Sequence, residues 1–107
     1  MRVALTTDGR NISKELAKTT VIEMYEINKG KLVGKLKIDV SAGGGYRGLL
    51  YILENEGVDV LLCGEVKGEE KKDLEDCGMQ VFSGAKGSVN KTLNMYLRGL
   101  NRRSKSK

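Results

Sequence analysis

Alternating apolar and polar positions predict three β-strands in the first forty residues. Residues 2–7 are a short β-prone run that ends at the turn pair Asp8-Gly9, and residues 20–27 are rich in β-branched and aromatic types. Asn28-Lys29-Gly30 is a turn signal before residues 31–40. A period of two in residues 31–40 indicates a half-exposed antiparallel strand. The apolar face of this strand carries Leu36, Ile38 and Val40. The second and third strands are therefore expected to form a hairpin.

The rest of the chain alternates between helical and strand patterns. The expected helices span residues 46–56, 67–77 and 89–99, and a shorter helical turn spans 12–18. The expected strands span 58–63 and 79–82. The first of these is continuously apolar, which is typical of a central parallel strand covered on both faces. This order predicts an α/β fold: a five-stranded mixed sheet with an N-terminal antiparallel hairpin element and helices on both faces.

Charge is distributed unevenly along the 107 residues. Five of the 19 basic residues lie in the last ten positions, and the remaining 14 balance the 14 acidic residues, so the net charge of +5 belongs to the C-terminal end. We expect one α/β domain over residues 1–100 and a disordered basic tail over 101–107. The tail has two interpretations, a solubilising end and a weak arm that binds phosphate or acidic groups.

Composition excludes several classes of function. The chain has no histidine, which removes His-based catalytic triads and zinc sites with His ligands. No apolar run approaches the ~20 residues that span a bilayer, so no membrane partner is expected. Cys63 and Cys77 form neither a disulfide framework nor a zinc motif, which favours a reduced, cytoplasmic setting.

A glycine-rich segment precedes the first long helix. Gly43-x-Gly45-x-x-Gly48 formally matches a dinucleotide fingerprint, but the strand before it alternates with charge and the chain has too few strands for that fold. The alternative is a loop whose N–H groups hold a small anion with help from Arg47. A nucleotide binder or enzyme that uses this loop is the weakest of the functions considered.

Two further features bear on chemistry. Cys63 ends the central strand, where a thiolate could bind a soft metal, but free cysteines are also common as small buried core residues. Asp8 follows the first strand, and residues 3–6 contain no acid. A two-metal nuclease, which needs an acid inside that strand, is therefore not expected.

The motifs together resemble the dinitrogenase iron–molybdenum cofactor biosynthesis family over about residues 1–100. The opening matches at Asp8-Gly9, Ile12-Ser13, Glu15-Leu16-Ala17 and Tyr25-Glu26. The second half matches from GVDVLLCGE, where the family has a strand ending in Cys-Gly-Gly, through a helix, a short strand and a final helix. The resemblance implies a small ribonuclease H-like α/β domain.

The resemblance also implies a function. Family members are non-enzymatic carriers or stores of iron–sulfur or iron–molybdenum cluster precursors, so we expect such a cofactor and cluster-assembly proteins as partners. This chain has Glu15 in place of the family histidine and Glu65 in place of the second glycine, and Ser41–Gly45 lacks the histidines common in that loop. Cys63 is the one soft ligand retained, so weakened or lost binding is also compatible with the pattern.

The resemblance places the candidate site between three loops. Cys63 is the expected metal ligand, and no catalytic residue is predicted. The expected cofactor-binding residues are Asp8, Glu15, Gly43, Gly44, Gly45, Arg47, Gly64 and Glu65. The alternative function is an interaction module for a protein or nucleic-acid partner, which would use the hairpin lysines and the tail. The tail cations are Arg102, Arg103, Lys105 and Lys107.

Overall fold

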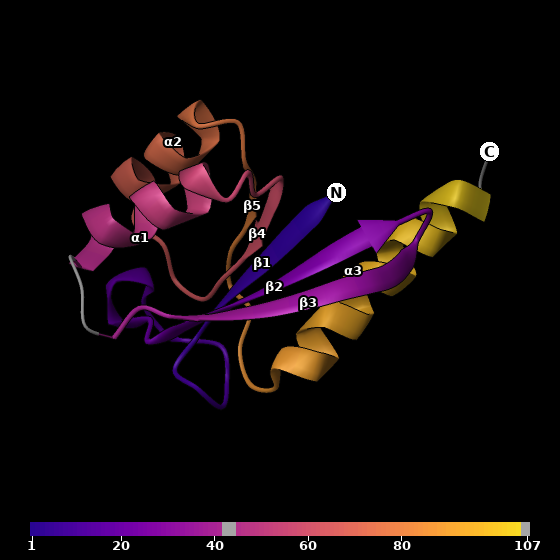
Figure 1. The fold of residues 1–107 in the computed structure, drawn as a ribbon, viewed down its shortest axis with the longest axis horizontal. Helices are drawn as coiled ribbons and strands as arrows, with labels where there is room; N and C mark the ends of the chain where they lie inside the picture. The colour runs from indigo at the N-terminus through magenta and orange to yellow at the C-terminus, as the bar shows by residue number, and fades with distance from the viewer. Residues whose placement is uncertain (42–44, 106–107) are drawn as a thin grey trace.

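The computed structural model describes residues 1–41 and 45–105, and in them a five-stranded sheet packs against helices (Figure 1). The strands are β1 (Arg2–Thr7), β2 (Val21–Asn28), β3 (Lys31–Asp39), β4 (Val60–Leu62) and β5 (Gln80–Phe82). The helices are α1 (Gly45–Asn55), α2 (Gly68–Asp76) and α3 (Val89–Lys105), with a short 3-10 turn, η1 (Leu16–Lys18), after β1. The predicted α/β class and order of elements are confirmed.

The strands lie in the order β3-β2-β1-β4-β5. β2 is antiparallel to both β1 and β3, whereas β1, β4 and β5 are parallel to one another. The sheet is therefore mixed, as predicted. The carboxyl ends of the three parallel strands meet at one edge, which is where open α/β sheets usually bind ligands.

The β2–β3 hairpin closes through Lys29 and Gly30, whose φ angles of +53° and +77° are both in the left-handed region. Two such residues are typical of the tight turn that fits the twist of paired strands. β3 is an edge strand and is more exposed than its alternation predicts. Ile38 pairs with Ile22 and packs partly against the core, but Leu36 is 50% exposed because β3 has no neighbour on its outer side.

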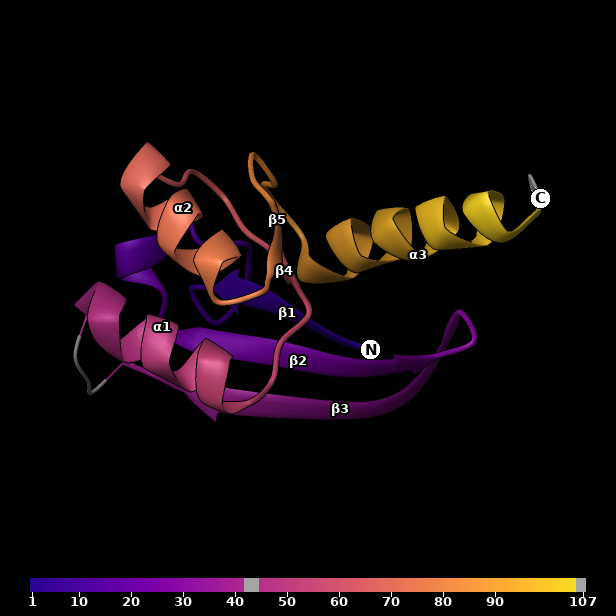
Figure 2. The same ribbon diagram turned by 90° about the horizontal axis from the view of Figure 1, so that it is seen from above.

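Two clusters of buried apolar residues flank the sheet, one on each face. α1 and α2 lie over one face and α3 lies over the other (Figure 2). Leu61 of β4 packs in the layer under α1 and α2, whereas Val60 and Leu62 pack in the layer under α3. Successive side chains of a strand point to opposite faces of the sheet, and both faces of β4 are covered. All three residues of β4 are therefore buried, which accounts for the continuously apolar sequence of this strand.

The ends of two helical segments differ from the prediction. The last helix, expected to end at residue 99, continues to Lys105, so residues 101–105 of the expected tail are helical. This stretch contains no glycine or proline, and arginine and lysine favour helix. The turn expected over 12–18 is reduced to η1, because Asn11 and Ile12 are extended and pair with Ser88 and Thr7 in β-bridges. None of the helices in the described ranges is long and apolar enough to cross a lipid bilayer.

Candidate functional site

Three loops meet at the carboxyl edge of the parallel strands. They follow β1, β4 and β5 and span residues 8–20, 63–67 and 83–88. Backbone hydrogen bonds join them: Glu65 N–H donates to the Lys14 carbonyl over 2.8 Å. Ala85 N–H donates to the Cys63 carbonyl over 3.0 Å, which ties the third loop to the second. The edge is therefore a connected surface formed by segments far apart in the sequence.

Gly64 lets the first and second loops approach each other. A Cβ atom built at this position would collide with the carbonyl oxygen of Ser13 and stand 2.8 Å from that of Lys14. Both neighbours are backbone atoms, which cannot move aside as a flexible side chain can. The close contact between the two loops thus requires a glycine at position 64. This contact places the backbone of Glu15 beside that of Glu65, where the two residues form a parallel β-bridge.

A cavity of about 700 Å³ opens between the three loops. Its charged lining residues are Lys14, Glu15, Lys18, Glu65 and Lys86. Ile12, Gly84 and Ala85 complete the lining. We call this cavity the edge groove. Its size is within the usual range for small-molecule sites.

The edge groove has more positive than negative charge. Lys18 Nζ lies 3.1 Å from Glu15 Oε2, so this pair is largely neutralised. Lys14 and Lys86 form no ion pair with any residue that the structure describes. Three lysines against two glutamates give a local excess of one positive charge, which favours an anionic ligand.

A smaller cavity of about 260 Å³ lies on the other side of the Glu15–Glu65 bridge. Lys18, Lys67 and Glu70 line it together with the two bridging glutamates. The N–H of Lys67 donates to Glu70 Oε1 over 2.9 Å, which fixes the start of α2. Glu15, Lys18 and Glu65 line both cavities, and Lys14 and Lys86 line the larger one alone.

Cys63 does not reach the edge groove. Its side chain is fully buried among the residues under α1 and α2, and its thiol lies 3.8 Å from the Phe82 carbonyl oxygen as a weak donor. Burial raises the pKa of the Cys63 thiol to about 11, so the group is protonated at neutral pH. A neutral, buried thiol is less reactive toward metals than an exposed thiolate, and the role of Cys63 as a metal ligand stays a prediction.

Direct metal coordination lacks a donor set. Among residues 1–41 and 45–105, no group of three or more Cys, Asp or Glu side chains is arranged to hold a metal ion, and the chain contains no His. Glu15 and Glu65 are adjacent, but Glu15 is already ion-paired with Lys18. The residues present therefore do not fit a site that ligates an iron or molybdenum atom directly.

Asp8 shapes the first loop instead of lining the groove. Its Oδ1 accepts hydrogen bonds from the N–H groups of Asn11, at 2.8 Å, and Arg10, at 3.0 Å. These bonds hold the pKa of Asp8 below its usual value. Gly9, with φ of +101°, completes the turn. The carboxylate is thus engaged in the turn and does not line the edge groove, and the binding role of Asp8 stays a prediction.

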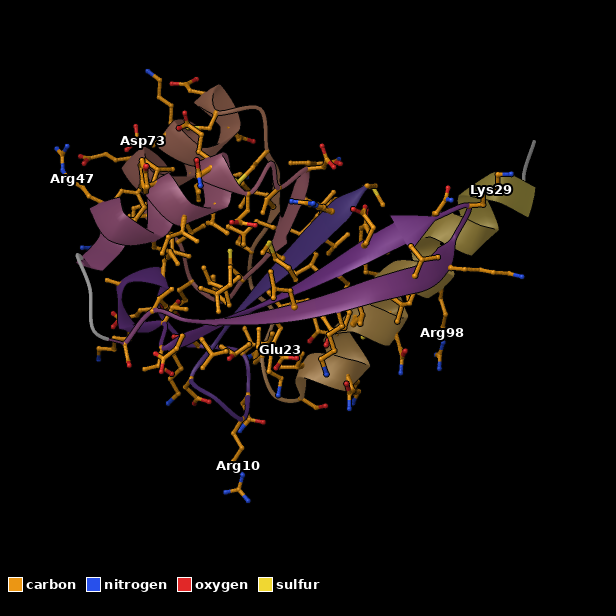
Figure 3. All side chains as sticks on the ribbon, in the orientation of Figure 1. Arg10, Glu23, Lys29, Arg47, Asp73 and Arg98 are labelled. Carbon is orange, nitrogen blue, oxygen red and sulfur yellow. The ribbon has the colours of Figure 1, made fainter. Side chains whose placement is uncertain are left out.

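The glycine loop is not part of the edge groove as far as the structure describes it. Gly43 and Gly44 lie outside the described residues. Gly45 begins α1 with φ of +56°, and Arg47 is exposed and extends from α1 into solvent (Figure 3). Neither Gly45 nor Arg47 lines the groove. Of the predicted residues, the structure brings together Glu15, Gly64 and Glu65.

Sequence reasoning missed Lys14, Lys18 and Lys86. Isolated loop lysines look like ordinary solvent-exposed residues, so composition does not single them out. A signal existed for Lys86, which follows the last parallel strand between Gly84 and Gly87, at an edge where ligands gather. Both glycines have positive φ angles, which is why the loop can turn back toward the groove.

Comparison with known proteins agrees with this fold. The family model described as dinitrogenase iron-molybdenum cofactor matches residues 1–99. The crystal structure of PH0822 superimposes with a TM-score of 0.83 and 18% identity, covering 92% of this chain and 90% of the other. A search of curated proteins found no match.

Two further solved structures have the same fold. The apo form of the orange protein from Desulfovibrio gigas has a TM-score of 0.78 and 18% identity, covering 92% of this chain and 88% of that one. A putative dinitrogenase from Methanocaldococcus jannaschii has a TM-score of 0.75 and 17% identity, covering 92% and 89%. At such low identity the structural similarity establishes the fold and not the ligand.

Proposed function

The chain belongs to the dinitrogenase iron-molybdenum cofactor family, and on this premise we propose that it is a non-enzymatic domain that binds and carries an anionic metal–sulfur species as cargo. The edge groove is the proposed binding site. The cargo is held as a preformed anion, through ion pairs and hydrogen bonds, and not through direct ligation of its metal. Cluster-assembly proteins that deliver or receive the cargo are the partners that this function requires.

The observation that carries the proposal is the pair of cations, Lys14 and Lys86, on opposite loops of the edge groove. Neither has an ion-pair partner among the described residues, and both line the cavity. Small metal–sulfur species with terminal sulfides carry negative charge. A lysine ammonium is a compact charge with three N–H donors. It can therefore bind terminal sulfides in several orientations.

The absence of a ligating set among the described residues supports binding of an intact cargo. Cys63 is buried and protonated, and Glu15, at the position of the family histidine, is paired with Lys18. A carboxylate in this place repels an anion and does not bind soft metals well. Glu65, which forms no ion pair with a described residue, therefore limits affinity, and this suits a carrier that must release its cargo.

Calorimetric titration with tetrathiomolybdate, a dianion that contains molybdenum and sulfide, tests the proposal in low-salt buffer without oxygen. A lysine near 4 Å from one unit of negative charge contributes about 1 kcal/mol in water, so a Lys14→Gln/Lys86→Gln variant is expected to bind the dianion at least about 30-fold more weakly. A Lys71→Gln/Lys72→Gln variant loses the same charge from the exposed side of α2 and is the matched control.

Two single variants distinguish binding of the anion in the edge groove from direct coordination of its metal by the protein. Glu65→Gln removes a negative charge from the groove and is expected to tighten binding severalfold. Cys63→Ser is expected to leave affinity unchanged, provided that circular dichroism shows a folded protein. Loss of binding in a folded Cys63→Ser protein, or equal binding by the Lys14/Lys86 variant, would contradict the proposed site.

A further inference from the structure

Acidic residues are absent from the last part of the chain. After Asp76 there is no Asp or Glu, whereas residues 77–107 contain seven Lys and Arg residues. Five of these cations belong to α3, which covers the sheet face opposite α1 and α2 (Figure 2). A helix surface that only contacts solvent usually carries both acidic and basic residues. α3 carries basic residues and no acidic ones, which distinguishes it from such a surface.

Four of the five cations of α3 occupy positions on one face of the helix. Lys91, Arg98, Arg102 and Lys105 are separated by seven, four and three residues, and at 100° per residue these positions fall within about 60° of one another. Val89 and Leu93 lie on the opposite side, where both are buried against the sheet. The four positions extend over fourteen residues, or about 21 Å along the helix axis. We call this row the α3 stripe.

The described part of the α3 stripe is open to solvent. Lys91 and Arg98 are exposed, and neither forms an ion pair with a residue that the structure describes. Asn94 and Met95 lie between them, and the four residues line a shallow depression of about 460 Å³. Arg98 projects away from the body of the protein (Figure 3).

We propose that the α3 stripe binds the phosphate backbone of a nucleic-acid duplex. Regularly spaced cations on a rigid helix complement the repeating charges of such a backbone, and this binding needs no contact with the bases. On the apolar side of α3, Val89 and Leu93 are buried and Tyr96 and Leu97 are partly buried against the sheet. Exposed Met95 is isolated, so the described side chains form no continuous apolar face for a lipid surface. The stripe has no aromatic residue on which an unpaired base could stack.

Fluorescence anisotropy with a labelled 20-base-pair DNA duplex tests this surface on the full chain. Neutralising four phosphates predicts a slope of about −3.6 for the logarithm of the binding constant against the logarithm of salt concentration. Affinity should then fall about 150-fold between 50 and 200 mM salt. In a Lys91→Gln/Arg98→Gln variant the slope should fall to about −1.8, or roughly 12-fold over the same range.

The Lys71→Gln/Lys72→Gln variant is again the control, because it lowers the net charge equally from another helix. It should keep the slope of the unmodified protein, and all variants should melt at the same temperature because the residues are exposed. An equal change in slope for both variants would show that only net charge matters and would overturn the proposal.

Two other results would also overturn it. One is no binding of the duplex at 50 mM salt. The other is displacement of the duplex by polyglutamate at equal charge concentration, which would assign the stripe to acidic proteins. Binding of tetrathiomolybdate by the Lys91/Arg98 variant should be unchanged, so failure of the duplex experiment leaves the proposed function of the edge groove separately testable.

Discussion

Replacing Gly64 by alanine tests whether close contact between the β1 and β4 loops holds the edge groove together. The new methyl group would meet the carbonyl oxygens of Ser13 and Lys14, so one loop must move away. Forcing an extra carbon into a packed site costs about 1–3 kcal/mol. Movement would also weaken the hydrogen bond from Glu65 N–H to the Lys14 carbonyl, worth about 1 kcal/mol.

Together these effects predict a loss of about 2–4 kcal/mol. For a domain of this size each kcal/mol lowers the melting temperature by about 4–8 °C, so thermal unfolding followed by circular dichroism should show a fall of at least 8 °C. Gly99→Ala is the control, because position 99 lies inside α3 with open space around a Cβ, and alanine there should stabilise the helix by about 1 kcal/mol. A Gly64→Ala protein that melts with the unmodified protein would refute the reasoning.

The structure makes three further predictions. At pH 8, Ellman's reagent should modify half-buried Cys77 in the folded protein and fully buried Cys63 only after denaturation, so two rapidly reacting thiols would show that the placement of Cys63 is wrong. The lowered pKa of Asp8 means that its charge stabilises the fold at neutral pH and that this contribution is lost as the pH falls through the folded-state pKa. Asp8→Asn should therefore lower the melting temperature more at pH 7 than at pH 2, and an equal change at both values would contradict this role of the Asp8 charge. Leu61→Ala in the central strand should cost about 2–5 kcal/mol in urea unfolding, and a loss below 1 kcal/mol would argue against burial of this side chain.

Much of the fold could be predicted because its signals are local. Residues 58–63 are continuously apolar, and β4 within them is indeed buried on both faces of the sheet. Asn28-Lys29-Gly30 supplies the left-handed backbone that a hairpin turn needs. The end of α3 was less predictable, because Arg102 and Lys105 suit both a solvated tail and a helix. Leu36 was misjudged because alternation does not reveal which strand is at the edge.

The candidate site was predictable only in part. Glu65 follows a parallel strand, and the rule that ligands gather there applies directly. Asp8 satisfies the same rule but is used by its own loop, which depends on backbone geometry that the sequence does not display. Lys14 and Lys86 are 72 positions apart, and only the folded chain brings both to one cavity. Cys63 was ambiguous, since a strand end and a buried core are compatible with the same residue.

The central claim is that an intact anionic metal–sulfur cargo binds in the edge groove between Lys14 and Lys86. Crystals soaked in tetrathiomolybdate and measured at the molybdenum absorption edge test it most directly, because anomalous scattering locates the metal without reference to the protein. We predict a molybdenum peak within the groove, beyond bonding distance of any Cys or Glu side chain. A peak bonded to Cys63, or one confined to another surface of the protein, would contradict the claim.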